Sequence, residues 1–155
     1  MQAQNPSGSP KEASTQPNLK RYLVKETWKD YEVTLEVNHD QLTEDIATEI
    51  NGFWYGAEDR LDTESGDVVR TVIRLFGKTM INMMLREGGT NFGINTKNCV
   101  TGEHPGPLWT RDLHDEEGWG GSEPGPYGWC GIRVVSAYVD APGYDDVELA
   151  EVSNA

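Results

Sequence analysis

The chain has 155 residues and a formal charge of −13, from 26 acidic and 13 basic side chains, which suits a single acidic domain. No segment approaches the roughly 18 consecutive apolar residues that a membrane span needs. The acidity argues against nucleic-acid binding through a broad positive surface, because neutralising phosphates takes clustered Lys and Arg. Five Trp and two periodic apolar segments argue against a fully disordered chain.

The N-terminal segment differs in composition from the rest of the chain. Residues 1–20 are mostly Ser, Gln, Pro, Asn and Gly, which predicts a disordered tail followed by one domain over residues 21–155. The segment lacks the basic and apolar regions of a secretory signal, so we expect a cytoplasmic protein. Cys99 and Cys130 are too few for a disulfide framework and are expected to be free there, whereas outside the cell they could pair.

Two segments near the start of the domain predict a β-hairpin. Residues 31–37 alternate apolar and polar side chains, which is typical of a half-buried strand. Residues 22–28 are expected to pair with it, although the connection at Lys29 and Asp30 lacks the Gly or Asn of tight hairpin turns.

The apolar period then changes to that of helices. Apolar residues from Leu42 to Ala57 recur at steps of three and four, which predicts a helix capped by Thr43 and ended by Gly56 or the acidic stretch after it. A second helix is predicted over residues 67–87, with Ser65 or Asp67 as its cap and Gly88–Gly89 as its stop. Its methionines at positions 80, 83 and 84 are interpreted as core, with a partner-binding surface as the alternative.

The C-terminal half mixes loops with one strong strand signal. Residues 90–130 are rich in Gly, Pro, Trp and acids, and we expect one short helix over 108–118 within ordered loop. Residues 131–139 are apolar on both faces and predict a central strand, and 147–152 predict a short final strand. The fold class expected is α+β, with two amphipathic helices on one face of a small antiparallel sheet.

Candidate catalytic and metal sites are weak. The set Cys99, His104, Asp112, His114 and Asp115 matches no zinc spacing. Consecutive acids at 115–117, with Trp residues to stack on sugars, could suggest a glycoside hydrolase. However, neighbouring carboxylates on a short helix point in different directions, and no apolar pocket to raise one pKa is indicated. No nucleophile triad or phosphate-binding loop stands out, so we expect no catalytic residue, metal or cofactor.

The placement of charge is more informative. Residues 88–155 hold three basic and 11 acidic side chains, a net charge of −8. Acids interleaved with large aromatics in a Pro- and Gly-rich region favour a docking surface for a basic partner, whereas plain solubility charge is the alternative. The predicted partner-binding residues are Asp112, Asp115, Glu116, Glu117, Glu123, Trp109, Trp119 and Trp129.

Several short motifs carry a family resemblance. The run 47–61 is followed by Gly66-Asp67-Val68-Val69, by Glu117-Gly118-Trp119 and by Gly131-Ile132-Arg133. With these motifs the chain resembles an uncharacterised family of small bacterial, prophage and phage proteins, a domain of unknown function, over about residues 30–152. The resemblance implies a mobile-element accessory protein acting inside a bacterium, and it transfers no site residue.

These observations lead to three functional hypotheses. The first is a non-enzymatic inhibitor that presents a nucleic-acid-mimicking acidic and aromatic surface to a basic host protein, such as a defence or nucleic-acid-processing complex. The second is a nucleotide or sugar binder with Trp109, Trp119 and Trp129 as pocket walls. The third is a carboxylate- or metal-dependent hydrolase. Partner and oligomeric state stay open.

Overall fold

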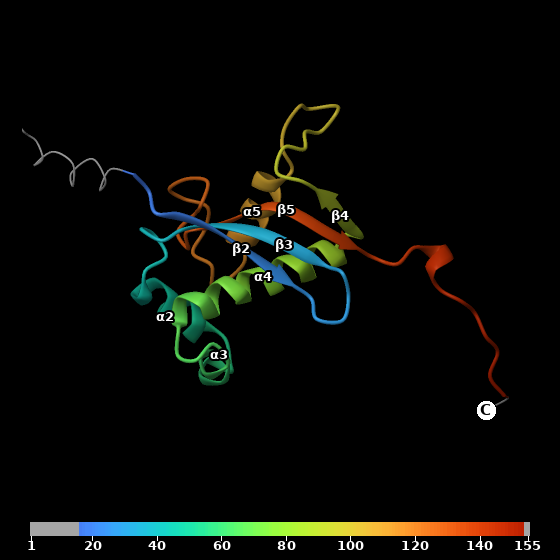
Figure 1. Ribbon diagram of the computed structural model, residues 1–155, viewed down its shortest axis with the longest axis horizontal. Coiled ribbons are helices and arrows are strands. Elements are labelled where there is room, and N and C mark those ends of the chain that lie inside the picture. Colours follow the sequence, from blue (N-terminus) through green and yellow to red (C-terminus); the bar gives the residue numbers. More distant parts are fainter. Residues whose placement is uncertain (1–15, 154–155) are drawn as a thin grey trace, which may run out of the picture.

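A four-stranded antiparallel sheet in the order β2–β3–β5–β4 forms the centre of the protein, seen in a computed structural model that describes residues 16–153 (Figure 1). The helix Val68–Arg86 packs on one face of this sheet, and the predicted α+β class is confirmed. The strands are β2 (Leu19–Lys25), β3 (Glu32–Asn38), β4 (Gly89–Phe92) and β5 (Ile132–Asp140). The helices are α2 (Glu44–Phe53), α3 (Ala57–Thr63), α4 (Val68–Arg86) and α5 (Gly106–His114), with a 3₁₀ turn at Tyr144–Asp146.

The predicted hairpin is confirmed as β2 and β3, although β2 ends at Lys25 and not at residue 28. The alternation in β3 places Val33, Leu35 and Val37 in the core with no exposed surface, while the side chains between them lie on the opposite face of the sheet. β2 begins at Leu19, two residues before the predicted start of the domain. Residues 16–18 of the predicted disordered tail lie in no helix or strand, and residues 1–15 lie outside the described residues.

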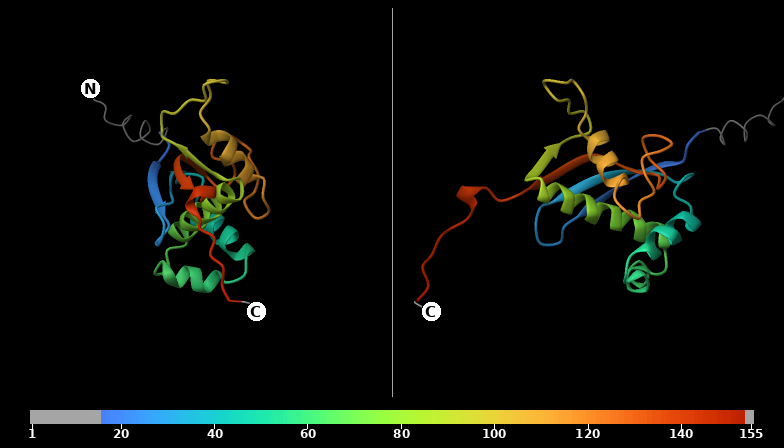
Figure 2. Two further views of the ribbon diagram at one scale, coloured as in Figure 1. Left: turned by 90° about the vertical axis from the view of Figure 1, so that its right-hand side faces the viewer. Right: turned by 180° about the vertical axis from the view of Figure 1, so that it is seen from behind.

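Helix α4 is the main cover of the sheet and contacts all four strands (Figures 1 and 2). Its predicted cap is confirmed, because the Asp67 side chain accepts a hydrogen bond from the Arg70 amide. Gly77 lets β2 approach closely, since a Cβ there would lie 2.5 Å from side-chain carbons of Val24. The three methionines at 80, 83 and 84 are buried, which confirms their core role. Within residues 16–153, no helix is long and apolar enough to cross a membrane.

The first predicted helix ends three residues before the expected Gly56, and a second short helix follows it. Thr43 caps α2 as predicted, but α2 ends at Phe53, and α3 starts after Gly56, whose φ of 86° lies in the left-handed region. Arg60 explains the break: its guanidinium donates to the backbone carbonyl oxygens of Asn51, Trp54 and Tyr55 at 2.7–3.1 Å. These carbonyls would otherwise lack partners at the end of α2. The acidic stretch expected to end the helix forms α3 instead.

The C-terminal half contains one strand that the sequence patterns missed and lacks one that they predicted. β5 lies between β3 and β4, as expected for a central strand. β4 was not predicted; it pairs only with residues 137–140 of β5. The final strand predicted at 147–152 is wrong, because this segment runs away from the body with no strand beside it, and Leu149 is 99% exposed (Figures 1 and 2).

Candidate functional site

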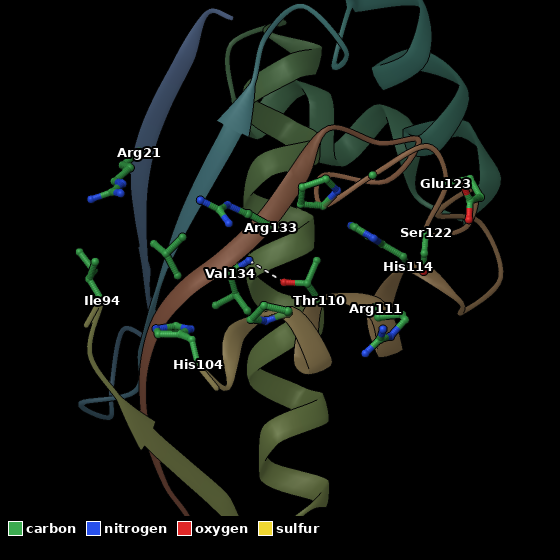
Figure 3. Close-up of a pocket in the computed structure, with 14 residues that line it drawn as sticks. Arg21, Ile94, His104, Thr110, Arg111, His114, Ser122, Glu123, Arg133 and Val134 are labelled. Carbon is green, nitrogen blue, oxygen red and sulfur yellow. Dashed lines mark hydrogen bonds between the residues drawn. The ribbon is translucent and has the colours of Figure 1, made fainter. Parts of the chain in front are cut away.

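Helix α5 lies against the part of β5 that β4 leaves unpaired. Its residues Gly106, Thr110 and His114 are spaced four apart and therefore share one face of the helix. The Thr110 hydroxyl oxygen accepts a hydrogen bond from the Val134 amide at 3.0 Å, drawn as a dashed line in Figure 3. The His114 Nε2 atom lies 2.7 Å from the Ile132 carbonyl oxygen. Side chains of α5 thus form the hydrogen bonds with the backbone of β5 that a further strand beside it would otherwise form.

The close approach of α5 depends on a glycine at its start. A Cβ at Gly106 would lie 2.6 Å from the Val134 carbonyl oxygen, which is a backbone atom that has little freedom to shift. The helix itself is shorter than predicted and begins two residues earlier, since it ends at His114 and not at residue 118.

The two histidines at this site hold the backbone in place. His114 is 1% exposed, and burial lowers its pKa despite the opposing hydrogen bond to Ile132, so the ring is neutral and Nε2 carries the proton. The Gly106 amide donates to Nδ1 of His104, which leaves Nε2 of His104 to donate to the Gly93 carbonyl at 2.9 Å. In the part of the chain that the structure describes, no three His, Cys, Asp or Glu side chains are placed to hold a metal ion.

A hollow of about 560 Å³ lies between α4 and α5, and we call it the acidic hollow. Four of the eight predicted partner-binding residues line it, namely Trp109, Asp112, Asp115 and Glu116. Glu87, at the end of α4, adds a carboxylate that the sequence analysis did not include. Arg86 compensates part of their charge through an ion pair with Glu116 at 3.4 Å. The lining residues are Met83, Arg86, Glu87, Leu108, Trp109, Asp112, Asp115 and Glu116.

The remaining predicted residues lie elsewhere. Trp119 is 1% exposed and packs in the core against Trp54 and Phe76, with ring centroids 5.3 and 5.2 Å away, so its ring does not reach the surface. It therefore cannot be a surface anchor or one wall of an open pocket in this fold. Trp129 is half-buried against the same core, and Glu117 is exposed after α5. Glu123 lines a different hollow.

That second hollow, of about 450 Å³, lies between α5, the loop before β5 and the face of the sheet away from α4 (Figure 3). We call it the arginine hollow, because Arg21 of β2, Arg111 of α5 and Arg133 of β5 line it. The sequence patterns did not indicate it. The three arginines are far apart along the chain, and only the strand pairing brings Arg21 and Arg133 to either side of β3.

The Glu36 carboxylate holds two of these arginines. It accepts from Arg21 Nε at 2.9 Å and from Arg133 Nη2 at 2.6 Å, and the Tyr127 hydroxyl also donates to it. Burial alone would raise the pKa of Glu36, but the hydrogen bonds from Tyr127, Arg133 and Arg21 outweigh it and lower that pKa to about 2. Glu36 is therefore ionised at neutral pH, and the alternation of β3 was the single sequence sign that it faces away from the core.

Both cysteines are free. Cys99 is exposed, whereas Cys130 is buried, and burial raises the pKa of the Cys130 thiol to about 12. The Cys130 thiol thus stays protonated at neutral pH and packs as a small apolar side chain.

Comparisons with known proteins place the chain in a family without giving it an activity. Protein ea10 of Escherichia phage lambda and the lambda prophage-derived protein ea10 of Escherichia coli O6:H1 (strain CFT073) are each 26% identical to it over 129 residues. These matches cover 83% of this chain and 91% of either relative. No solved structure matches the chain. A model of the family described as "Protein of unknown function (DUF2528)" matches residues 32–149, and the resemblance noted above to a phage and prophage family is confirmed: the chain belongs to the DUF2528 family.

Proposed function

We propose that this protein is a non-enzymatic binding protein that docks a basic surface of a host protein on the acidic hollow. The observation that carries the proposal is the convergence of Trp109, Asp112, Asp115 and Glu116 on one hollow beside Glu87. Four carboxylates surround it against the single guanidinium of Arg86, so the lining carries a formal net charge of −3.

The hollow combines charge with apolar surface in the way that protein interfaces do. Leu108 is 59% exposed and Trp109 is half-buried at its wall, and both can lose further surface on binding. Buried apolar and aromatic anchors supply most of the affinity of an interface, while charges steer the encounter and select the partner. A Lys or Arg side chain of the partner would fit such a site, with its alkyl stem on the apolar wall and its charge near the carboxylates.

The nature of the relatives supports a host target. The curated relatives are a phage protein and a prophage-derived protein, and a phage-encoded binding protein would meet the proteins of the bacterium in which it is made. Exposed carboxylates can replace the phosphates of nucleic acid on a basic groove. In this proposal the partner is a component of a defence or nucleic-acid-processing complex, and docking inhibits it.

A pull-down from a bacterial host lysate tests the proposal. We expect the wild-type chain to retain a basic protein, with retention falling as NaCl rises, because salt screens charge pairs. The variant Asp112→Lys/Asp115→Lys should lose that protein. The matched control Asp145→Lys/Glu148→Lys, which makes the same charge change in the exposed C-terminal segment, should keep it.

Two outcomes would contradict the proposal. One is that the wild-type chain retains no basic protein at all. The other is that both double variants retain the same protein equally well while circular dichroism shows both to be folded, because binding would then not depend on the acidic hollow.

A further inference from the structure

We infer that the arginine hollow is a binding site for a small molecule that carries an oxyanion, either a phosphate or a carboxylate. Arg21, Arg111 and Arg133 all line this hollow (Figure 3), and the ligand would contact them. This site is separate from the acidic hollow and has the opposite charge, so the inference does not rest on the proposed docking function.

Two of the three arginines are held in place before any ligand arrives. Glu36 engages Nε of Arg21, and its other oxygen engages Nε and Nη2 of Arg133. Among the described residues, this leaves both terminal nitrogens of Arg21 and Nη1 of Arg133 without a protein acceptor. The Arg133 guanidinium also lies 5.1 Å from the Tyr127 ring centroid, which fixes its plane. A guanidinium fixed in this way loses little conformational entropy when it binds an anion.

Arg111 completes the site from the opposite wall. It is exposed on α5 and forms no ion pair or side-chain hydrogen bond with the described residues, so all five of its donors are free. The three arginines carry +3, whereas Glu123 of the lining and Glu36, the ion-pair partner of Arg21 and Arg133, carry −2, which leaves a net charge of +1. The whole chain carries −13. A positive hollow in a strongly acidic protein favours an anion over a cation or a neutral ligand.

The two histidines of the hollow are engaged with the backbone. His104 and His114 both line the hollow, but each uses Nε2 to hold a backbone carbonyl. The arginines are therefore the groups that recognise the anion, and guanidinium forks match the paired oxygens of phosphate and carboxylate.

The rest of the lining suits the body of a small molecule. Ile94, Pro107 and Pro126 give the hollow apolar walls beside the arginines. Its volume of about 450 Å³ falls within the range of roughly 300–1,000 Å³ that is usual for small-molecule sites. An extended polyanion would need a longer basic track than three arginines in one hollow provide.

Isothermal titration calorimetry on the full chain tests the inference with matched probes. Adenosine 5′-monophosphate and adenosine share one body and differ in the phosphate, and citrate tests a carboxylate source. We expect adenosine 5′-monophosphate or citrate to bind and adenosine not to bind. Binding of the phosphate probe alone or of citrate alone identifies which oxyanion the site prefers.

Two charge-matched variants locate the site. Arg111→Gln should weaken binding by about tenfold or more, because it removes a charged hydrogen-bond donor. Arg70→Gln removes another exposed arginine, in α4 and outside the hollow, and should leave the affinity unchanged.

The inference is overturned by any of four results. The first is that neither adenosine 5′-monophosphate nor citrate binds at millimolar concentration, and the second is that adenosine binds as well as its monophosphate while citrate does not bind. The third is that the Arg111→Gln and Arg70→Gln variants bind the probe with the same affinity. The fourth is that a single-stranded oligonucleotide binds through Arg111 while both small probes fail, which would make the ligand a nucleic acid.

Discussion

The Glu36 carboxylate joins three parts of the chain. It accepts hydrogen bonds from Arg21 of β2, Arg133 of β5 and Tyr127 of the loop before β5, and its side chain is only 9% exposed. A buried carboxylate without such partners would favour its neutral form. Here the donors outweigh burial, so one acidic residue orders two cations that line the arginine hollow.

Replacement of this carboxylate should therefore weaken the fold. We expect Glu36→Gln to lower the free energy of unfolding by about 1–3 kcal/mol, because two guanidinium groups lose their charged acceptor. Urea denaturation followed by circular dichroism measures the change. Glu32→Gln is the control, since it makes the same change on the same strand at a residue without an ion pair among the described residues. Equal losses in the two variants would contradict the role given to the Glu36 network.

The low pKa of Glu36 also predicts a pH dependence of stability. Its pKa is about 2 in the folded chain, against an ordinary value of 4.5, so the folded state favours the ionised form. The stabilisation is complete above the ordinary pKa and is lost as pH falls through the folded pKa. Between pH 5 and pH 2, wild-type stability should fall more steeply than that of Glu36→Gln. Parallel profiles from urea melts across this range would contradict the prediction.

At the scale of elements, α5 takes the place of a strand along half of β5. Thr110 accepts the Val134 amide and His114 donates to the Ile132 carbonyl, so the unpaired edge of β5 is covered. The same helix carries both hollows on different faces. Arg111 faces one hollow, while Asp112 and Asp115 face the other.

Two glycine substitutions should have opposite effects on stability. Gly106→Ala should cost about 1–3 kcal/mol, because its Cβ would meet the Val134 carbonyl oxygen at 2.6 Å and force α5 away from β5. Gly52→Ala, in α2 with nothing within 4 Å of the added Cβ, should stabilise by about 0.5–1 kcal/mol. Urea denaturation gives both values, and hydrogen exchange at the Val134 amide should quicken only in Gly106→Ala. Slow exchange retained in that variant would show that α5 tolerates the added methyl group.

At the scale of the whole molecule, acidic charge dominates, with a net charge of −13 and a pI near 4.5. Three of the five ion pairs among the described residues, Arg70–Glu64, Arg74–Glu64 and Arg86–Glu116, involve arginine side chains that are 60–62% exposed, so their contribution to stability is small. The positive arginine hollow and the negative acidic hollow are local departures from an otherwise diffuse negative field. Repulsion within that field opposes the compact state.

This repulsion predicts that salt stabilises the protein. Raising NaCl from low to moderate concentration at pH 7 should raise the thermal unfolding midpoint, because salt screens the repulsion more than it weakens a few exposed ion pairs. The rise should largely vanish near pH 4.5, where the net charge approaches zero. Differential scanning calorimetry gives the midpoints. Chloride is the appropriate salt, since sulfate could occupy the arginine hollow. A falling midpoint at pH 7 would mean that ion pairs outweigh the repulsion.

Local patterns were enough to predict most elements of this fold. The β3 alternation, the Thr43 and Asp67 caps and the apolar run of β5 each depend on neighbours along the chain. The errors arose where a specific side-chain contact or strand pairing, which apolar periodicity does not report, decides the outcome. Arg60 ends α2 by binding its carbonyls, β4 forms because β5 lies beside it, and the alternating segment at 147–152 has no strand to join.

The sequence by itself determined the acidic character, the α+β class and the enrichment of acids and aromatics after residue 88. Only the tertiary structure decided which of those groups meet. It buries Trp119, gathers Asp112 and Asp115 beside α4, and brings Arg21 and Arg133 together across Glu36. The physical reason is that charge counts and periodicity are properties of neighbours along the chain. A hollow is made by strand register and helix packing between residues that are far apart along the chain. An acidic sequence therefore contains an arginine-lined cavity that its composition did not indicate.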